Sequence, residues 1–305
     1  MASERLRARL GPLTLRSPLI AASGTVGSVW EWASVADVTR FGAAVAKSVA
    51  PTAWEGRPPP RLAPVGPGML NGIGIQNPGV VAWLESVPQK LSKLDIEVWG
   101  SAVGNTPDDY ASVASSLAGS GIGAVEVNLS CPNLDDGRMF SMDPGRSAVV
   151  VEAVVAESKV PIGAKLSPNT PDIVAVASAC REAGASFVTL TNTAVGFGID
   201  IETRRPLLSG GAGGYSGPGL KPLSMRCVYE VSQALPDLPI VGCGGVTSGA
   251  DVLEYLLAGA SAVGLGTVLL SEPKAGSRIA RELMSEMDRL DIESVGGLTG
   301  SVRAW

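Results

Sequence analysis

The sequence predicts an α/β fold: a (β/α)8 TIM barrel in which a single domain covers residues 1–305 and long loops lie over its carboxyl-terminal face. Eight short apolar runs recur along the chain, with helical patterns between them. The runs are nearly continuous rather than alternating, which is typical of parallel strands covered on both faces. A chain of 305 residues also lies within the range of one α/β barrel. An open doubly wound sheet shares this alternation, and the pattern alone does not exclude it.

The eight runs are the predicted strands, and each ends in small or polar residues. They are Leu19–Ser23, Ala43–Ser48, Glu97–Val103, Ala124–Ser130, Pro161–Ser167, Ser186–Asn192, Pro239–Cys243 and Ser261–Gly266. Three of the predicted helices begin at N-cap patterns, which lie at residues 106–109, 169–172 and 248–251. We expect these three helices to end at Gly121, Gly184 and Gly259.

Two connections are too long for simple loops. Residues Ala50 to Asn77 are rich in Pro and Gly, and residues Thr193 to Lys221 contain a run of glycines at 210–214. Long connections in a compact domain usually serve as lids or binding loops, so we expect both to lie near the functional site.

Composition excludes several function classes. Lys plus Arg is 24 and Asp plus Glu is 29, with no long run of either sign, which argues against a nucleic-acid or anionic-membrane surface. The four cysteines have no C-x-x-C or other metal-ligand spacing, which predicts no metal site and fits a reducing, cytoplasmic setting. No apolar stretch approaches the ~20 residues of a membrane span. Because the chain has no histidine, proton transfer falls to Cys, Lys, Asp, Glu or Tyr.

Polar residues gather at the carboxyl ends of the predicted strands. In a barrel these ends form one mouth, where such enzymes place their active sites. The residues are Ser23, Lys47, Ser48, Asn128, Ser130, Cys131, Lys165, Thr191, Asn192 and Thr193.

Strands seven and eight end in glycine-rich segments, at residues 242–245 and 264–267. Loops in these places commonly bind phosphate in barrels, because glycine lets backbone N–H groups approach an anion. The helix that opens near Ser248 would add the positive end of its dipole. The alternative is that these glycines only make tight turns.

Two side chains are candidates for chemistry. Pro132 ends the strand directly after Cys131, so the thiol would stand at the mouth rather than inside a ladder. Lys165 ends an apolar strand, where burying an unpaired ammonium would be costly. Lys165 could be a Schiff-base nucleophile or a fixed positive charge, and spacing alone does not separate these two roles.

These residues resemble the dihydroorotate dehydrogenase family. The matching segments run in family order from Ser17 to Thr267 and cover most of the chain. The most specific are Asn-Leu-Ser-Cys-Pro-Asn at 128–133 and Ile-Gln-Asn-Pro-Gly at 75–79; others lie at 22–24, 47–48, 70–74, 165–169, 191–193 and 216–218.

The resemblance implies FMN at the barrel mouth and a pyrimidine substrate beside it. The residues that would contact FMN are Ser23, Lys47, Ser48, Ser101, Asn128, Lys165, Thr191, Gly217, Gly244, Gly245, Gly266 and Thr267. The residues that would hold the pyrimidine are Lys47, Asn71, Gly72, Ile73, Gly74, Ile75, Asn128, Asn192 and Thr193.

The implied reaction is oxidation of (S)-dihydroorotate to orotate in de novo pyrimidine (UMP) biosynthesis. Cys131 takes the place of the family's base and would abstract the C5 proton while hydride passes from C6 to FMN. Soluble members of the family have cysteine there, whereas membrane-associated members have serine and an N-terminal extension. Lys165 near the flavin's pyrimidine end would stabilise negative charge on the reduced ring, which favours its fixed-charge role.

Within the family, residues 75–78 and 203–206 are similar to the NAD-linked branch (class 1B) more than to the fumarate-linked one. That branch pairs the barrel with an electron-transfer subunit that carries FAD and a [2Fe–2S] cluster, in a homodimer core or a heterotetramer. The four scattered cysteines of this chain cannot supply a cluster, so the relay would belong to the partner.

Three positions depart from the family pattern: Ser101 in place of an asparagine that touches the flavin, Gly72 in place of an alanine, and Arg138 in place of a glycine. Because of them a related dihydropyrimidine such as dihydrouracil is an alternative substrate. Two further hypotheses are a flavin-free Schiff-base barrel that uses Lys165, and a barrel without catalysis that serves as a binding subunit.

Overall fold

The computed structural model describes residues 4–130 and 139–303, and its centre is a closed barrel of eight parallel strands. The strands pair in the order β10-β15-β16-β3-β4-β7-β8-β9, so the barrel prediction is confirmed and the open sheet is excluded. Each strand lies within its predicted run: β3 (Leu19–Ala21), β4 (Ala43–Val45), β7 (Glu97–Ala102), β8 (Ala124–Asn128), β9 (Ile162–Leu166), β10 (Phe187–Leu190), β15 (Ile240–Cys243) and β16 (Ala262–Leu265).

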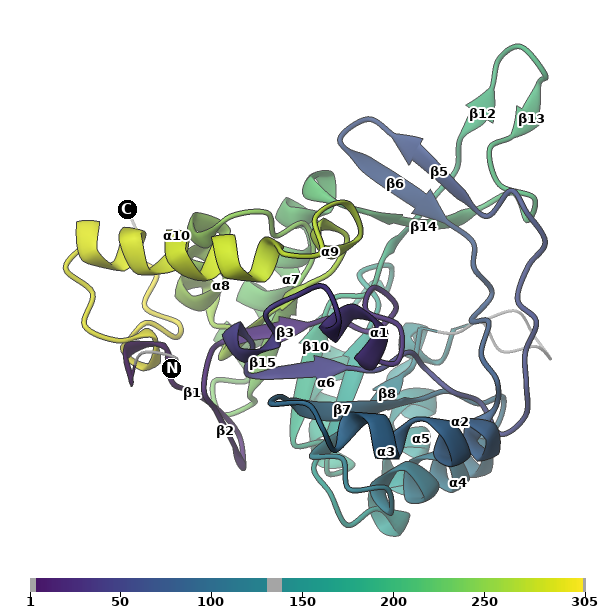
Figure 1. Ribbon diagram of the computed structural model, residues 1–305, viewed down its shortest axis with the longest axis horizontal. Coiled ribbons are helices and arrows are strands. Elements are labelled where there is room, and N and C mark those ends of the chain that lie inside the picture. The colour runs from purple at the N-terminus through teal and green to yellow at the C-terminus, as the bar shows by residue number, and fades with distance from the viewer. Residues whose placement is uncertain (1–3, 131–138, 304–305) are drawn as a thin grey trace.

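Helices surround the barrel (Figure 1). Neighbouring helices pack side by side in chain order, from α4 against α5 through to α8 against α10. The helices are α1 (Trp30–Ala33), α2 (Val80–Ser86), α3 (Pro88–Leu91), α4 (Pro107–Ala118), α5 (Pro144–Glu157), α6 (Ile173–Glu182), α7 (Lys221–Ala234), α8 (Gly249–Ala258), α9 (Val268–Ser271) and α10 (Ala275–Arg289). Short 3-10 turns lie at Glu4–Leu6, Val38–Arg40, Phe140–Met142, Pro218–Leu220 and Val295–Gly297.

The three predicted N-caps are confirmed. Thr106 and Ser248 each form a capping box with the acid three residues later, and the Asp172 side chain caps α6. Gly259 follows α8 as predicted, with φ 122°. The helix α4 ends at Ala118, earlier than predicted, and Gly121 lies three residues beyond it with φ 85°.

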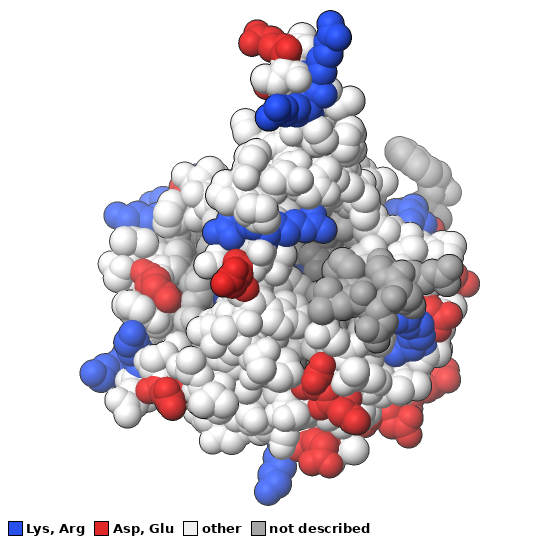
Figure 2. All heavy atoms as spheres, turned by 90° about the vertical axis from the view of Figure 1, so that its right-hand side faces the viewer, with Lys and Arg blue, Asp and Glu red and all other residues white. Residues whose placement is uncertain are grey.

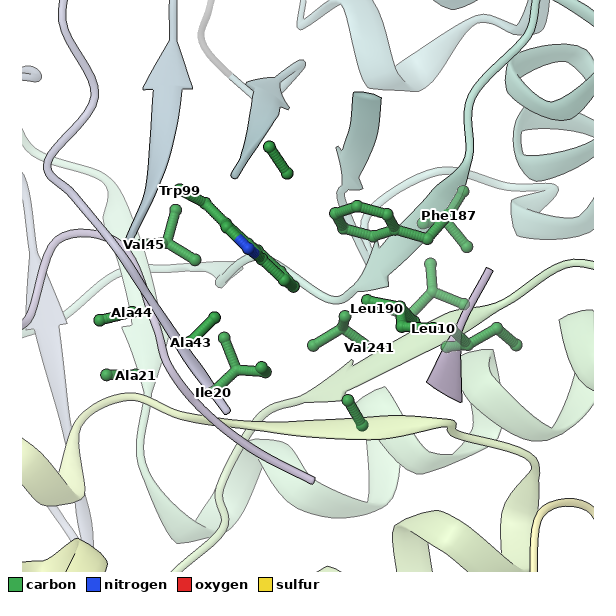
Figure 3. Close-up of a cluster of buried hydrophobic side chains, with 14 of the residues drawn as sticks. Leu10, Ile20, Ala21, Ala43, Ala44, Val45, Trp99, Phe187, Leu190 and Val241 are labelled. Atoms are coloured by element: carbon green, nitrogen blue, oxygen red, sulfur yellow. The ribbon is translucent and has the colours of Figure 1, made fainter. Parts of the chain in front are cut away.

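Aromatic and aliphatic side chains fill the barrel from its amino-terminal side (Figure 3). Trp99 and Phe187 are fully buried, and their ring centroids lie 5.1 Å apart. The β1–β2 hairpin (Ala8–Leu10, Leu13–Leu15) covers this end of the barrel, where Leu10 is fully buried. Among the described residues, this packing closes the amino-terminal end of the barrel interior, so a ligand of the barrel would enter at the carboxyl-terminal end.

The two long connections combine into one antiparallel sheet. Strands β5 (Leu62–Val65) and β6 (Gly68–Asn71) come from the first connection, β11 (Ala194–Gly196) and β14 (Gly213–Ser216) from the second, and they pair in the order β11-β14-β6-β5. The short hairpin β12–β13 (Ile199–Asp200, Arg205–Pro206) extends beyond this sheet (Figure 1). The sequence predicts lids or binding loops here rather than strands, because the many glycines and prolines obscure the alternation by which strands are recognised.

Four apolar side chains on this projection face solvent. Val195, Phe197, Ile199 and Ile201 are 60%, 56%, 58% and 87% exposed, and we call them the hairpin surface. Charged residues of both signs cluster at the projecting tip (Figure 2). Within residues 4–130 and 139–303, no helix has the length and apolarity needed to cross a membrane.

We expect Asp251→Asn to lower the free energy of unfolding at pH 7 by about 1–2 kcal/mol. The Asp251 carboxylate accepts hydrogen bonds from the N–H groups of Thr247 and Ser248 and from Lys221, at 2.5–2.9 Å. Burial alone would raise the pKa of this carboxyl, but the hydrogen bonds outweigh burial and lower the pKa below its usual value.

A group whose pKa is lowered by folding stabilises the fold above its unfolded-state pKa, and this contribution disappears as the pH falls through the folded-state pKa. The difference between wild type and variant in urea unfolding should therefore shrink below about pH 4. Asp108→Asn, on the exposed first turn of α4, is the matched control and should change little. Equal stability of wild type and Asp251→Asn at pH 7 would contradict this prediction.

Candidate active site

Polar side chains from six strand ends and glycines from two more meet at the carboxyl-terminal mouth of the barrel. Because the strands are parallel and the barrel is closed, every residue directly after a strand lies on this one side. The structure places there Ser23 after β3, Lys47 and Ser48 after β4, Ser101 on β7, Asn128 at the end of β8, Lys165 on β9, Thr191 to Thr193 after β10, and the glycines after β15 and β16.

A chain of hydrogen bonds joins four of these positions. The Ser48 and Ser101 hydroxyl oxygens lie 2.8 Å apart, and both residues are buried. The Asn128 side-chain N–H donates to the Ser48 hydroxyl at 3.4 Å, and Asn192 donates to the Asn128 side-chain oxygen at 3.3 Å. The bonds hold the two amides in fixed orientations at the ends of β8 and β10.

The Asn71 side chain reaches the same region from the inserted sheet. Its N–H donates to the Gly214 carbonyl at 3.1 Å. A Cβ at Gly214 would overlap the Thr193 hydroxyl, so glycine at this position lets Thr193 and Asn71 come together. Asn169 secures the arrangement by donating to the Thr193 carbonyl at 3.2 Å and to the Ser167 hydroxyl at 2.6 Å.

Sequence reasoning did not assign Asn169 or Ser167 a role. The signal that could have found them is the polar pair directly after the fifth strand, separated by a proline.

The predicted substrate residues 72–75 lie in an irregular segment that directly follows β6. The Ile73 carbonyl accepts from the Arg57 N–H at 3.0 Å, and the Ile75 carbonyl accepts from the Asn77 side chain at 2.8 Å. Gly74 has φ 69°, and a Cβ there would lie 2.7 Å from the Arg57 nitrogen. In the part of the chain that the structure describes, Asn71 links this segment to Thr193 through Gly214.

Lys165 forms a buried ion pair beneath the mouth. Its Nζ lies 3.7 Å from Glu126 Oε1, and the two side chains are 8% and 2% exposed. The Thr189 hydroxyl donates to the other Glu126 oxygen at 2.7 Å. Burial alone would lower the pKa of Lys165, but the Glu126 carboxylate outweighs burial, and the pKa lies above its usual value. Lys165 is therefore a fixed positive charge. Sequence reasoning missed Glu126, because an acid in mid-strand gives no sign of its partner.

The two glycine segments offer backbone N–H groups to the mouth. Gly244 and Gly245 have φ 144° and 70°, and a Cβ at Gly245 would lie 2.7 Å from the Lys221 nitrogen and 2.9 Å from the Gly217 oxygen. A Cβ at Gly266 would meet only the Ala22 methyl, at 4.0 Å, so the space in front of Gly266 is open. Among the described residues, the N–H groups of 244–246 and 266–268 have no protein acceptor.

The N-terminus of α8 does not join this group of donors, contrary to the expectation from sequence. The N–H groups of Thr247 and Ser248 bond to Asp251, and the Gly249 N–H bonds to Glu282 at 3.0 Å. The capping box by which this helix was predicted thus already occupies the N–H groups that precede its first turn.

Cys131, the predicted base, lies outside the described residues, as does Arg138. The described residue nearest in sequence is Ser130, whose N–H donates to the Asn128 side-chain oxygen at 3.3 Å.

A family model described as dihydroorotate dehydrogenase matches residues 5–287 of the chain. The chain belongs to the dihydroorotate dehydrogenase family. Similar curated members of the family include the catalytic subunit of dihydroorotate dehydrogenase B (NAD(+)) from Geobacter sp. (strain M21), 41% identical over 95% of each chain. The subunit of the same name from Alkaliphilus metalliredigens is 37% identical over 99% of this chain and 100% of its own.

A solved dihydroorotate dehydrogenase from Eimeria tenella, in complex with ferulenol, has the same fold. Its TM-score is 0.83 over 98% of this chain and 89% of that chain, at 20% sequence identity. The barrel thus has a solved counterpart within the family.

Proposed function

We propose that this protein oxidises (S)-dihydroorotate to orotate in de novo pyrimidine biosynthesis, as a single FMN-binding barrel domain. The observation that carries the proposal is the buried Lys165 ammonium beneath a ring of fixed amides and hydroxyls, beside free backbone donors. Such a mouth suits a planar, electron-accepting ring with a phosphate on one side and a polar pyrimidine on the other.

Two features of the chain fit FMN. The N–H groups without a protein acceptor at Gly244, Gly245, Gly266 and Thr267, and the open space in front of Gly266, suit a phosphate. Lys165 makes no hydrogen bond to any described residue although its side chain is 92% buried, so its donors remain for a ligand. Ser23, Lys47, Ser48, Ser101, Asn128, Thr191 and Gly217 would line the remainder of the flavin.

When bound, FMN supplies the acceptor for the two electrons that leave the substrate as hydride from C6. The carboxylate and amide edges of the pyrimidine would be held by Lys47, Asn71, Asn128, Asn192 and Thr193, together with residues 72–75. Lys165 would place positive charge at the flavin's pyrimidine end, where it is already oriented before any electron arrives. Cys131 would take the C5 proton, since the chain has no histidine for this task.

The buried ion pair disfavours the Schiff-base alternative. A lysine nucleophile must lose its proton, and burial next to a like charge or in apolar surroundings is what lowers its pKa. Lys165 instead faces Glu126, which raises the pKa.

We also propose an electron-transfer partner carrying FAD and a [2Fe–2S] cluster, with NAD as the acceptor. The similar family members are named catalytic subunits of NAD(+)-linked enzymes, and the four cysteines of this chain have no cluster spacing.

The homodimer core of this assembly would use the hairpin surface. Its four side chains are each more than half exposed, and such a patch usually marks a protein contact. The tip between β12 and β13 carries Asp200 and Glu202 followed by Arg204 and Arg205. A two-fold axis would set the acids of one copy against the arginines of the other, so the occupant that fits is a second copy of this chain.

Cys131→Ala should retain FMN but bleach about 10²- to 10⁴-fold more slowly with dihydroorotate, because the C5 proton then has no acceptor. Anaerobic stopped-flow absorbance of the flavin measures the rate, with dihydrouracil as a second substrate. Cys227→Ala, a buried position on α7, is the control. Bleaching of Cys131→Ala at the wild-type rate would remove Cys131 from the mechanism. Faster bleaching of the wild type by dihydrouracil than by dihydroorotate would contradict the assignment of dihydroorotate as the substrate.

Gly266→Ala tests the phosphate position. The fold has room for the methyl, so the melting temperature should not change, whereas a phosphate in that space would collide with it. We expect the dissociation constant of FMN, from fluorescence quenching, to rise at least about tenfold. Gly296→Ala, where a Cβ also meets nothing, is the control and should bind FMN normally. Unchanged FMN affinity in Gly266→Ala would place the phosphate elsewhere.

Ile201→Lys should convert a dimer into single chains by placing charge in the apolar contact. Sedimentation velocity measures the mass, and Val81→Lys, 64% exposed on α2, is the control that should stay dimeric. A monomeric wild type, or an Ile201→Lys variant that remains dimeric, would contradict the assignment.

A further inference from the structure

Glu126 is a buried acid that the proposed reaction does not use. It lies on β8, two residues before Asn128, and its side chain is 2% exposed. The next two strands around the barrel supply its neighbours: Lys165 on β9 and Thr189 on β10, which are partners in the strand register. The three side chains meet inside the barrel, and Lys165 is the register partner of Asn128 on the neighbouring strand.

The two carboxylate oxygens of Glu126 have different surroundings. Oε2 accepts the Thr189 hydroxyl at 2.7 Å. Oε1 has no hydrogen bond within the described chain, and its one charged neighbour is Lys165 Nζ at 3.7 Å. The Thr189 hydroxyl fixes the position of the carboxylate, and the free oxygen faces Lys165, so the carboxylate can stabilise the positive charge of the ammonium.

We propose that Glu126 is the positioning residue for Lys165: its carboxylate, anchored by Thr189, supplies the counter-charge that keeps Lys165 an ammonium inside the barrel while the ammonium's N–H donors stay available to the ligand. At 3.7 Å the carboxylate is close enough for strong attraction in a dry interior, yet too far to take up a donor in a hydrogen bond. The Glu126 carboxylate thus supplies negative charge to Lys165 without using any N–H group of the ammonium.

The titratable groups that act on Lys165 from the strands around it are Glu126 on β8 and Cys243 on β15. Burial raises the pKa of the Cys243 thiol, so Cys243 is neutral near pH 7 and adds no negative charge. Glu126 is the anion that remains. Without Glu126, desolvation would act alone on a side chain that is 8% exposed, and desolvation favours neutral lysine.

The first experiment measures Lys165 directly and needs no flavin. Lysines labelled with ¹³C at Cε are followed by NMR as the pH is raised in the ligand-free protein, with Lys165→Arg identifying the signal. In wild type the Lys165 signal should not titrate below about pH 10. In Glu126→Gln the midpoint should fall by about 2 pH units or more, because burial is then uncompensated.

Three further variants separate a charge effect from a packing effect. Glu126→Asp retains the charge and should recover most of the midpoint. Thr189→Val removes only the anchor and should lower the midpoint less, in the same direction; this variant decides the matter if Glu126→Gln does not fold. Glu97→Gln on β7, whose side chain bonds to Trp99 instead, is the matched control and should titrate as wild type does.

The second experiment rests on the proposed function, since it follows the midpoint potential of bound FMN with pH. With Lys165 still charged and Glu126 neutralised, the potential should lie above that of wild type at low pH. Above the new midpoint of Lys165 the potential should fall below that of wild type. A merely structural role would shift the potential equally at all pH values and would produce no crossing.

An unchanged Lys165 midpoint in Glu126→Gln, or a crossing that is absent in the flavin-loaded variant, overturns the proposal. Protein that cannot be loaded with FMN defeats the proposed function alone, because the NMR titration still decides the role of Glu126.

Discussion

The parallel closure of the barrel is the constraint on which everything else depends. Pairing of Val263 with Leu19 joins the last strand to the first across most of the chain. Once that ladder forms, eight strand ends must share one rim, and side chains more than 200 residues apart in sequence become neighbours. Packing of Trp99 against Phe187 closes the other end of the barrel interior, so within the described residues a substrate of the barrel would bind at the carboxyl-terminal end. The topology of the barrel thus determines where the mouth lies, and the individual side chains determine what it can bind.

Much of this fold could be predicted because its signals are local. An apolar strand, a capping box and a terminal glycine can each be recognised within ten residues, and all eight strands and three N-caps followed from such patterns. The inserted sheet could not be predicted this way. Its strands pair residues 62–71 with 194–216, and the glycines that let Thr193 approach Asn71 also remove the hydrophobic alternation that marks a strand.

The site divides along the same line. Residues at strand ends could be assigned from position and family resemblance, and the structure gathers Ser48, Asn128, Asn192 and Thr193. The partner of Lys165 could not be predicted from the sequence, because Glu126 lies on a different strand and no local pattern connects the two residues. The start of α8 shows the same limit: the sequence indicates that Asp251 caps the helix, but not that capping occupies the N–H groups an anion would need.

The inserted sheet has its own small core of Ala63, Leu70 and Leu208, separate from that of the barrel. Asn71 and Thr193 lie on this sheet or at its edge, while Asn128 and Lys165 belong to the barrel. Part of the mouth is therefore supported by a layer that packs around its own core. Substitutions among Ala63, Leu70 and Leu208 would act on the positions of Asn71 and Thr193, and would leave the strands that carry Asn128 and Lys165 unchanged.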